Sequence, residues 1–459
     1  MLNKYLKSSI PAARKLVKEL RKTYDYVSIL GSHVLTKSIV VGTATSSIDE
    51  AETECGFVIK VYKDGRYSEY SCDEIKGLKA EDVIKAVELK EVYSTEFKVK
   101  MLSEKEHIED YLREDPDKIS DKEIIKRLTA IKDEMHKETK VINVHTVYLK
   151  RQTSKIFVSE KKCLTQKYDW INAMLLVVVR DGTNIKSNYH AEGEASSLKA
   201  LDLLKKDSAD ILDIAVRLLN AKPIKPGKYT IITDPSISGL IAHEAFGHGV
   251  EMDMFVKNRA KAKDYVGKYV ASPIVDMYDG AKGVVSAASY FFDDDGIEAH
   301  KTQIIKKGIL QRGISDSLSA LTLGTEPTGN GRRESYKRKV YTRMTNTYFG
   351  KGKDKLEDMI KSVKHGYFVC QTNNGMEDPK NWQIQCTASY GLEIKDGEFT
   401  GKIVTPVIIS GYVVDLLSSI SMVSDKVKVI GSGMCGKGHK EYVYVSDGGP
   451  YLKAEAKLS

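Results

Sequence analysis

The chain has no long uninterrupted run of apolar residues, which excludes a membrane-spanning helix. Its longest apolar stretch, residues 403–423, contains Pro406, Gly411 and Asp415 and is typical of buried strand and helix. Residues 15–22 mix basic and apolar side chains in the pattern of an amphipathic helix, without the hydrophobic region or the cleavage site of a signal peptide. We therefore expect a cytoplasmic protein without a membrane partner.

Paired cysteines and blocks of basic residues are also missing. The six cysteines are widely scattered and form no CxxC pair, which is typical of reduced thiols and not of a disulfide framework. The formal charge of +8 is spread over 71 Lys and Arg against 63 Asp and Glu, and no basic block interleaved with aromatic residues stands out. This charge pattern does not favour nucleic acid as a partner.

The length of the chain predicts two domains. At 459 residues it is too long for one ordinary hydrophobic core, while 41% hydrophobic and 29% charged residues are typical of a globular protein. Residues 222–227, which read KPIKPG, interrupt the pattern with two prolines and a glycine. We place the domain boundary there, with an N-terminal domain over residues 1–221 and a C-terminal domain over residues 222–459.

The first half repeats one pattern, which predicts a duplicated α/β substructure. Alternating apolar and polar residues surround an Asp-Gly turn at residues 64–65, and the same occurs around residues 181–182. Each predicted hairpin is followed by a helical pattern, the first from about residue 80 and the second over residues 195–221. We expect charged helices over residues 103–140 between the two units. The predicted fold class is α+β, with an N-terminal α/β domain of hairpin-helix units.

The second half is rich in turns and predicts a mainly β domain. Another Asp-Gly turn lies at residues 396–397, where it favours a hairpin. Short β-like runs occupy residues 299–310, 383–394, 401–409 and 427–430. The main exception is the segment around residue 245, which we expect to be a metal-binding helix.

Residues 241–249 read IAHEAFGHG and contain two histidines and a glutamate within six positions. This is the set from which zinc peptidases build a metal site and its general base. His243 and His248 are five residues apart, a rotation of about 140° on an ideal helix. A shared metal therefore requires a π-bulge or an early helix end, which Gly247 permits. Two unrelated histidines on a buried helix are the alternative.

The neighbouring residues supply candidates for the rest of the site. Glu251 and Asp253 follow the motif and can hold the far nitrogens of ligating histidines, although solvated acids at a helix end would have the same pattern. Cys435 lies in a glycine-rich loop where Lys437 would favour its thiolate. A catalytic zinc needs a third protein ligand. The candidates are His300, His439, Glu251, Asp253, the acids at 293–295, and Cys435.

Two further segments suggest substrate contacts. Residues 325–336, TEPTGNGRRESY, resemble a phosphate-binding loop only superficially because they lack the Walker spacing. Their guanidinium pair can clamp a carboxylate or peptide carbonyls, and solvated arginines on a surface loop are the alternative. Residues 343–348, RMTNTY, can supply a strand edge for an extended peptide. The predicted substrate-binding residues are Gly329, Asn330, Arg332, Arg333 and Asn346.

Four motifs together carry a resemblance to a known family. HEAFGHGVEMD, TGNGRRESY, RMTNTYF and GMCGKG occur in this order and resemble the TldD branch of the TldD/PmbA family, once described as modulators of DNA gyrase and now regarded as metallopeptidases. The resemblance runs across most of residues 222–451. Any one motif would be weak, but the four together are specific.

The resemblance implies a zinc ion held by His243, His248 and Cys435, with Glu244 as the catalytic base. It implies a cytoplasmic peptidase acting on peptides or unfolded chains in an extended conformation. It also implies a dimer, either a homodimer or a heterodimer with a PmbA-like paralogue that lacks the zinc motif. A thiol hydrolase with Cys435 as nucleophile and a non-enzymatic gyrase- or DNA-associated modulator are the alternatives.

Overall fold

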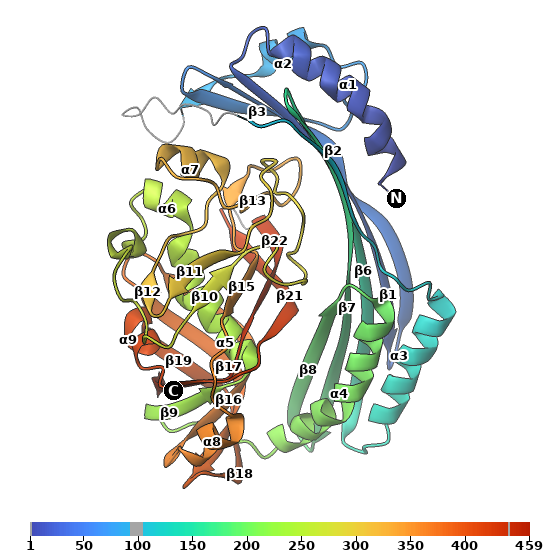
Figure 1. Ribbon diagram of the computed structural model, residues 1–459. Coiled ribbons are helices and arrows are strands. Elements are labelled where there is room, and N and C mark those ends of the chain that lie inside the picture. The colour runs from blue at the N-terminus through green and yellow to red at the C-terminus, as the bar shows by residue number, and fades with distance from the viewer. Residues whose placement is uncertain (1, 92–103, 439–440) are drawn as a thin grey trace.

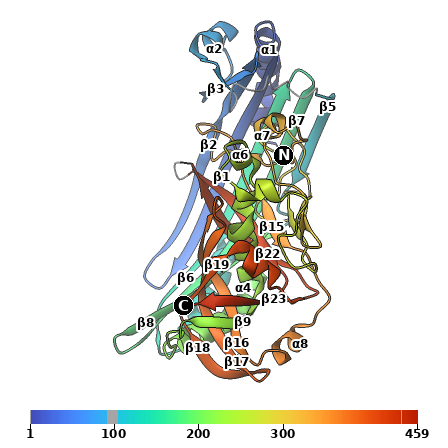
Figure 2. The ribbon, with the colours of Figure 1, turned by 90° about the vertical axis from the view of Figure 1, so that its left-hand side faces the viewer.

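A long curved sheet from the first half of the chain arches over a β-rich second half (Figure 1). The computed structural model describes residues 2–91, 104–438 and 441–459. The first sheet has the strand order β4-β3-β2-β1-β6-β7-β5, and β8 also pairs with β7. The side view shows its strands running past the C-terminal half along much of the molecule (Figure 2).

The first half contains both predicted hairpins, together with the long strands β1 and β6, which were not predicted. Both Asp-Gly hairpins are confirmed, β2–β3 and β7–β8, with Asp64, Gly65 and Gly182 in the left-handed region that such turns require. The helices are α1 Lys4–Leu20, α2 Ala80–Ala86, α3 Asp121–Met135 and α4 Ser197–Leu218. The strands are β1 Tyr26–Gly42, β2 Ser46–Lys63, β3 Arg66–Cys72, β4 Lys90–Glu91, β5 His107–Arg113, β6 Val141–Ser159, β7 Lys162–Asp181 and β8 Asn184–Glu194.

The prediction of charged helices over residues 103–140 was only partly right. Helix α3 is present, but His107–Arg113 forms strand β5, which pairs in parallel with β7. Tyr111 stacks on Phe291 of the second half, with 4.9 Å between the ring centroids. Pairing and packing with distant residues therefore outweigh the local charge pattern. Residue 103 lies outside the described residues.

The two faces of the first sheet have different chemistry. Apolar side chains at alternate positions, such as Val27, Ile29 and Ile39 of β1, form clusters with helices α1, α3 and α4. Helices α1 and α3 lie along the convex side (Figure 1). The opposite, concave face turns toward the second half and is largely polar, with the buried Lys60 and the partly buried Lys155 among its residues.

In the described part of the second half, three sheets are joined by several short helices. A six-stranded sheet has the order β12-β11-β10-β15-β22-β21, and a seven-stranded sheet has the order β16-β9-β23-β19-β17-β18, with β20 beside β23. The third sheet pairs β13 with β14. The strands are β9 Gly227–Thr233, β10 Met277–Asp279, β11 Thr302–Lys306, β12 Ile309–Leu310, β13 Gly331–Arg332, β14 Tyr341–Thr342, β15 Asn346–Phe349, β16 His365–Asp378, β17 Gln383–Lys395, β18 Glu398–Val404, β19 Val407–Tyr412, β20 Met422–Val423, β21 Lys428–Lys437, β22 Glu441–Gly449 and β23 Leu452–Leu458.

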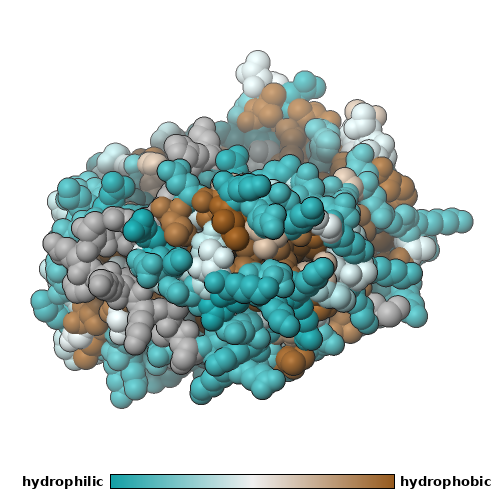
Figure 3. Space-filling view, turned by 90° about the horizontal axis from the view of Figure 1, so that it is seen from above, coloured by the Kyte–Doolittle hydropathy of each residue, from teal (hydrophilic) through white to brown (hydrophobic). Residues whose placement is uncertain are grey.

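The helical segments of the second half are short. They are α5 Pro235–Leu240, η1 Ile241–Gly247, η2 His248–Val250, α6 Met252–Val256, η3 Lys261–Tyr265, α7 Ser317–Thr322, α8 Leu356–Lys361 and α9 Val413–Ser418. Among the described residues, no helix combines the length and apolar character needed to cross a membrane. Seen from above, hydrophilic residues cover most of the surface, and apolar residues form smaller patches between them (Figure 3).

Two sequence-based expectations about the second half were wrong. Residues 430–438 do not form a loop, because most of them belong to strand β21, which pairs with β22. The segment at 343–348 does not supply a strand edge, because β15 lies between β10 and β22. The boundary after residue 221 stays a prediction; α4 ends at Leu218, and the backbone of Lys222 already pairs with Val404.

Buried ion pairs join the concave face to the second half. The ammonium of Lys60 lies 2.5 Å from Asp295 Oδ1, and Lys155 pairs with Asp294. Arg333 pairs with Glu69 at 3.0 Å. The Lys60 and Asp295 side chains are only 10% and 2% exposed. Each charge has therefore lost most of its hydration and interacts with the other charge instead.

We predict that Lys60→Met lowers the free energy of unfolding by about 3–5 kcal/mol, because it leaves the buried Asp295 carboxylate without this cation. Urea unfolding followed by circular dichroism measures the change. Lys63→Met, at the end of the same strand, is the matched control and should shift stability by less than about 0.5 kcal/mol. Equal midpoints for the two variants would contradict the importance of the buried pair.

Candidate metal centre

The two histidines of the motif lie at either end of a π-helical turn. Helix α5 changes at Ile241 into the π-helix η1, and a 3-10 turn begins at His248. The backbone N–H of His248 donates to the carbonyl of His243, a hydrogen bond between residues five apart. Their rings therefore come together, with centroids 5.1 Å apart. The predicted departure from α geometry is confirmed.

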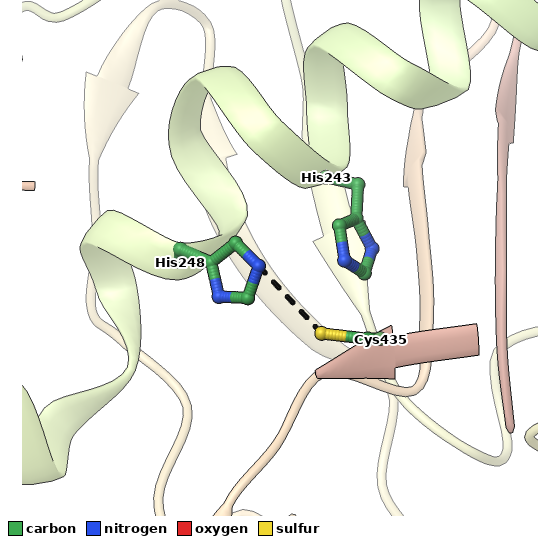
Figure 4. A group of neighbouring side chains, drawn as sticks. All are labelled: His243, His248 and Cys435. Carbon is green, nitrogen blue, oxygen red and sulfur yellow. Dashed lines mark hydrogen bonds between the residues drawn. The ribbon is translucent and has the colours of Figure 1, made fainter. Parts of the chain in front are cut away.

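Strand β21 brings a thiol to the two imidazoles (Figure 4). Cys435 Sγ lies 3.6 Å from His248 Nε2, and one ligand atom from each of His243, His248 and Cys435 lies within 4.8 Å of the others. Two nitrogens and one sulfur are a suitable donor set for zinc and leave a fourth position for water or substrate.

The polar atoms of this group fit a metal ion. His243 is buried, and its Nδ1 has no hydrogen-bond partner among the described residues. Burial opposes ionisation of the Cys435 thiol, but the imidazoles of His243 and His248 lower its pKa well below the usual range. A thiolate is the form of cysteine that binds metal, and a divalent cation can replace the protons that it shares with the imidazoles.

Glu251 supports the second histidine. Its Oε2 lies 3.3 Å from His248 Nδ1, the nitrogen of that ring that does not face Cys435. Such a carboxylate orients the ring and raises its basicity as a ligand. Asp253 is also buried, but it contacts Lys437 and Lys257 and neither histidine. Of the two acids predicted to support the ligands, only Glu251 contacts one directly.

Glu244 lies beside the three possible ligands. Its Oε2 is 3.8 Å from His248 Nε2, and its side chain is 18% exposed. Burial raises the pKa of this carboxyl, which brings it closer to the range useful for proton transfer near neutral pH. Strand β16 packs directly against it, since a Cβ on Gly375 would lie 2.4 Å from Glu244 Cγ.

The other candidate ligands lie elsewhere or outside the described residues. The acids at 293–295 bind lysines and backbone N–H groups at the joint between the two halves. His300 lines a separate cavity, together with Tyr26 and Arg312. His439 lies outside the described residues. Among the described candidates, only Cys435 joins the two histidines as a metal-binding triplet.

The predicted substrate-binding asparagines and glycine are buried in the second half. Asn330 donates to Asp279 Oδ1 at 2.7 Å, and Asn346 donates to the carbonyl of Gly280 at 3.0 Å. Gly329 has a φ of 72°, and a Cβ there would lie 2.4 Å from a backbone oxygen. These contacts hold the loops around the centre, and a role in substrate binding stays a prediction.

The two predicted substrate-binding arginines also have partners within the protein. Arg332 donates to the carbonyls of Met344 and Tyr444 at 2.7 and 2.6 Å. Arg333 pairs with Glu69 of the first sheet. Both line a cleft between the two halves. A role in substrate binding stays a prediction for them as well, and their present contacts are structural.

Several supporting residues were not predicted from the sequence. The buried Arg343 donates to the carbonyl of Cys435 at 2.5 Å and so holds the cysteine strand. Met344 packs directly on Gly247, since a Cβ there would lie 2.1 Å from Met344 Sδ. Glu377 accepts from the backbone N–H of Gly249 at 2.9 Å. All three contacts join segments that are distant in the sequence, and the local sequence does not predict them.

Comparisons with known proteins agree with this centre. A family model described as the PmbA/TldA metallopeptidase C-terminal domain matches residues 226–456, half of the chain. The chain belongs to this metallopeptidase family. It is 35% identical over 252 residues to a metalloprotease TldD homolog of Buchnera aphidicola, and 30% identical over 242 residues to a zinc metalloprotease TldD homolog of Saccharolobus solfataricus.

These matches cover 54% and 52% of this chain, and 51% and 53% of the relatives, so the chain spans about half the length of each. The fold extends the likeness to almost the whole chain. A Thermotoga maritima structure described as a modulator of a DNA gyrase matches 98% of this chain and 100% of its own, with a TM-score of 0.77. At 20% identity this match concerns the fold alone.

We predict that the purified protein binds about one zinc per chain, since the triplet supplies three ligands. Cys435→Ala should lose most of this zinc on dialysis, because only two imidazoles remain. Metal analysis by mass spectrometry measures the content. Cys72→Ala, which removes a thiol in the first sheet, should bind as the unmodified protein does. Full zinc occupancy and affinity in Cys435→Ala would show that the third ligand is misassigned.

Proposed function

We propose that this protein is a zinc-dependent peptidase that hydrolyses peptides or unfolded polypeptides in an extended conformation. The proposal depends above all on one observation: two imidazoles and a thiol lie within 4.8 Å of one another with a carboxylate beside them. Family membership supports the same chemistry. Three ligands leave a position where water and a scissile carbonyl can react.

The side chains divide the chemical work. His243, His248 and Cys435 would hold a zinc ion, which would act there as a Lewis acid toward water and a carbonyl group. Glu244 accepts the proton of the attacking water and passes it to the leaving amine. Glu251 keeps the His248 ring in a fixed orientation during this cycle.

The position of the cysteine supports the preference for extended chains. Cys435 lies on β21, which is the last strand of its sheet within the described residues. The edge of a sheet can bind an extended peptide through backbone hydrogen bonds and so hold it without strong sequence preference. A folded domain does not present its backbone in this form, so we infer that substrates must be unfolded.

We also propose that the active protein is a cytoplasmic dimer, either of two copies or with a PmbA-like paralogue. The family resemblance supports the dimer. The full triplet and Glu244 are present here, so this chain would be the catalytic subunit of such a pair.

A thiol hydrolase is the second candidate function, because Cys435 Sγ and His248 Nε2 already lie 3.6 Å apart. The same proximity also allows both atoms to bind one metal ion. A chelator should abolish peptidase activity in the proposed enzyme, whereas a thiol hydrolase would remain active without metal and be stopped by alkylation. A DNA-associated modulator would instead require salt-dependent DNA affinity.

We expect Glu244→Gln to keep its zinc and to lose about 100- to 10,000-fold in hydrolysis rate, since the amide cannot accept the proton. Cleavage of a mixed peptide library, with metal analysis in parallel, measures both quantities.

Glu377→Gln is the matched control. Burial raises the pKa of Glu377 well above its usual range. Glutamine is a close mimic that retains the oxygen accepting from Gly249, and the loss should stay below about tenfold. Loss of zinc from Glu244→Gln would instead identify Glu244 as a ligand or a structural support.

The proposal on substrates predicts a difference between two forms of one protein. The enzyme should cleave a denatured, reduced and alkylated substrate and leave its native form intact, because only the unfolded chain can align with a strand edge. Gel electrophoresis follows the cleavage, and light scattering gives the mass of the enzyme under the same conditions. Equal cleavage of both forms by a monomer would contradict both the substrate and the dimer proposals.

A further inference from the structure

Lys437 lies on the same strand as Cys435, two residues further on, so both side chains project from the same face of β21. Its ammonium contacts three oxygen atoms: Glu251 Oε2 at 2.9 Å, Asp253 Oδ1 at 2.8 Å and the carbonyl of Thr342 at 2.9 Å. An ammonium has three donors, and here each one has an acceptor. These three contacts therefore fix the orientation of the Lys437 side chain.

These contacts connect two of the metal ligands through the protein. Glu251 Oε2, which accepts from Lys437, also lies 3.3 Å from His248 Nδ1. The path from Cys435 runs along β21 to Lys437, then through Glu251 to the His248 ring. It joins the cysteine strand to the second histidine without passing through the metal.

The charged side chains of Lys437, Glu251 and Asp253 have little freedom to move, because they are largely buried. The Lys437 side chain is 13% exposed, and those of Glu251 and Asp253 are 2% and 0% exposed. A buried carboxylate without its cation would draw in water or turn toward another donor.

We propose that Lys437 is a positioning residue that sets the place of His248 relative to Cys435 before the metal binds. This role differs from the sequence-based expectation that Lys437 favours the thiolate, because its three donors point to oxygen atoms of other residues. The inference rests on the metal centre of the proposed function but not on peptide hydrolysis.

A comparison of two lysines that contact the same acid tests this role. Lys257 lies 3.3 Å from Asp253 Oδ2, but only Lys437 also reaches Glu251. Zinc affinity of the full-length Lys437→Met and Lys257→Met variants is measured by competition with a chromophoric chelator. Cobalt is substituted for zinc in parallel, and its thiolate charge-transfer and d–d bands report the arrangement of the ligands.

Lys437→Met should bind zinc about 10- to 100-fold more weakly, as expected when the support of a ligand is lost, with shifted cobalt bands. Lys257→Met should behave as the unmodified protein does. Unchanged affinity and cobalt spectrum in a folded Lys437→Met would overturn the proposal, and so would equal losses in the two variants.

If Lys437→Met does not fold, the Asp253→Asn variant tests the positioning role of Lys437 instead. It keeps an acceptor oxygen but weakens the hold on Lys437, while Glu251 and the ligands are unaltered. Lower zinc affinity supports the positioning role, and unchanged affinity overturns it. Because hydrolysis is not measured, a protein that binds zinc without cleaving peptides would contradict the proposed function and leave this test valid.

Discussion

The hydrogen bond from the His248 N–H to the His243 carbonyl is the constraint on which the metal centre depends. A regular α-helix would direct the two rings to different faces, about 140° apart. The wider π turn brings them together, and it leaves Glu244 beside them. Short π segments are rare, and surrounding structure must stabilise them.

Here the stabilising contacts come from segments that are distant in the sequence. Met344 packs directly on Gly247, and Glu377 of β16 accepts from the N–H just after the second histidine. Arg343 holds the carbonyl of the cysteine residue. The geometry of the centre therefore depends on two sheets as well as on the helix, and a short peptide with the same motif would lack all of these contacts.

The sequence was most informative where the chemistry is local. The five-residue spacing of His243 and His248 required a departure from α geometry, and the Asp-Gly pairs predicted the turns. The failures concern long-range pairing. Glycines at 431–438 suggested a loop, yet the partner strand β22 makes most of this segment a strand. The acids at 293–295 suggested ligands, yet lysines of the first sheet lie opposite them.

The charged joint between the two halves has a thermal consequence. The desolvation cost of pairing Lys60 with Asp295, Lys155 with Asp294 and Arg333 with Glu69 falls as temperature rises, because the hydration of ions becomes less favourable. The apolar clusters under α1, α3 and α4 gain no comparable advantage on heating. Warming therefore stabilises the interface between the two halves relative to the apolar cores within them, and cooling has the opposite effect.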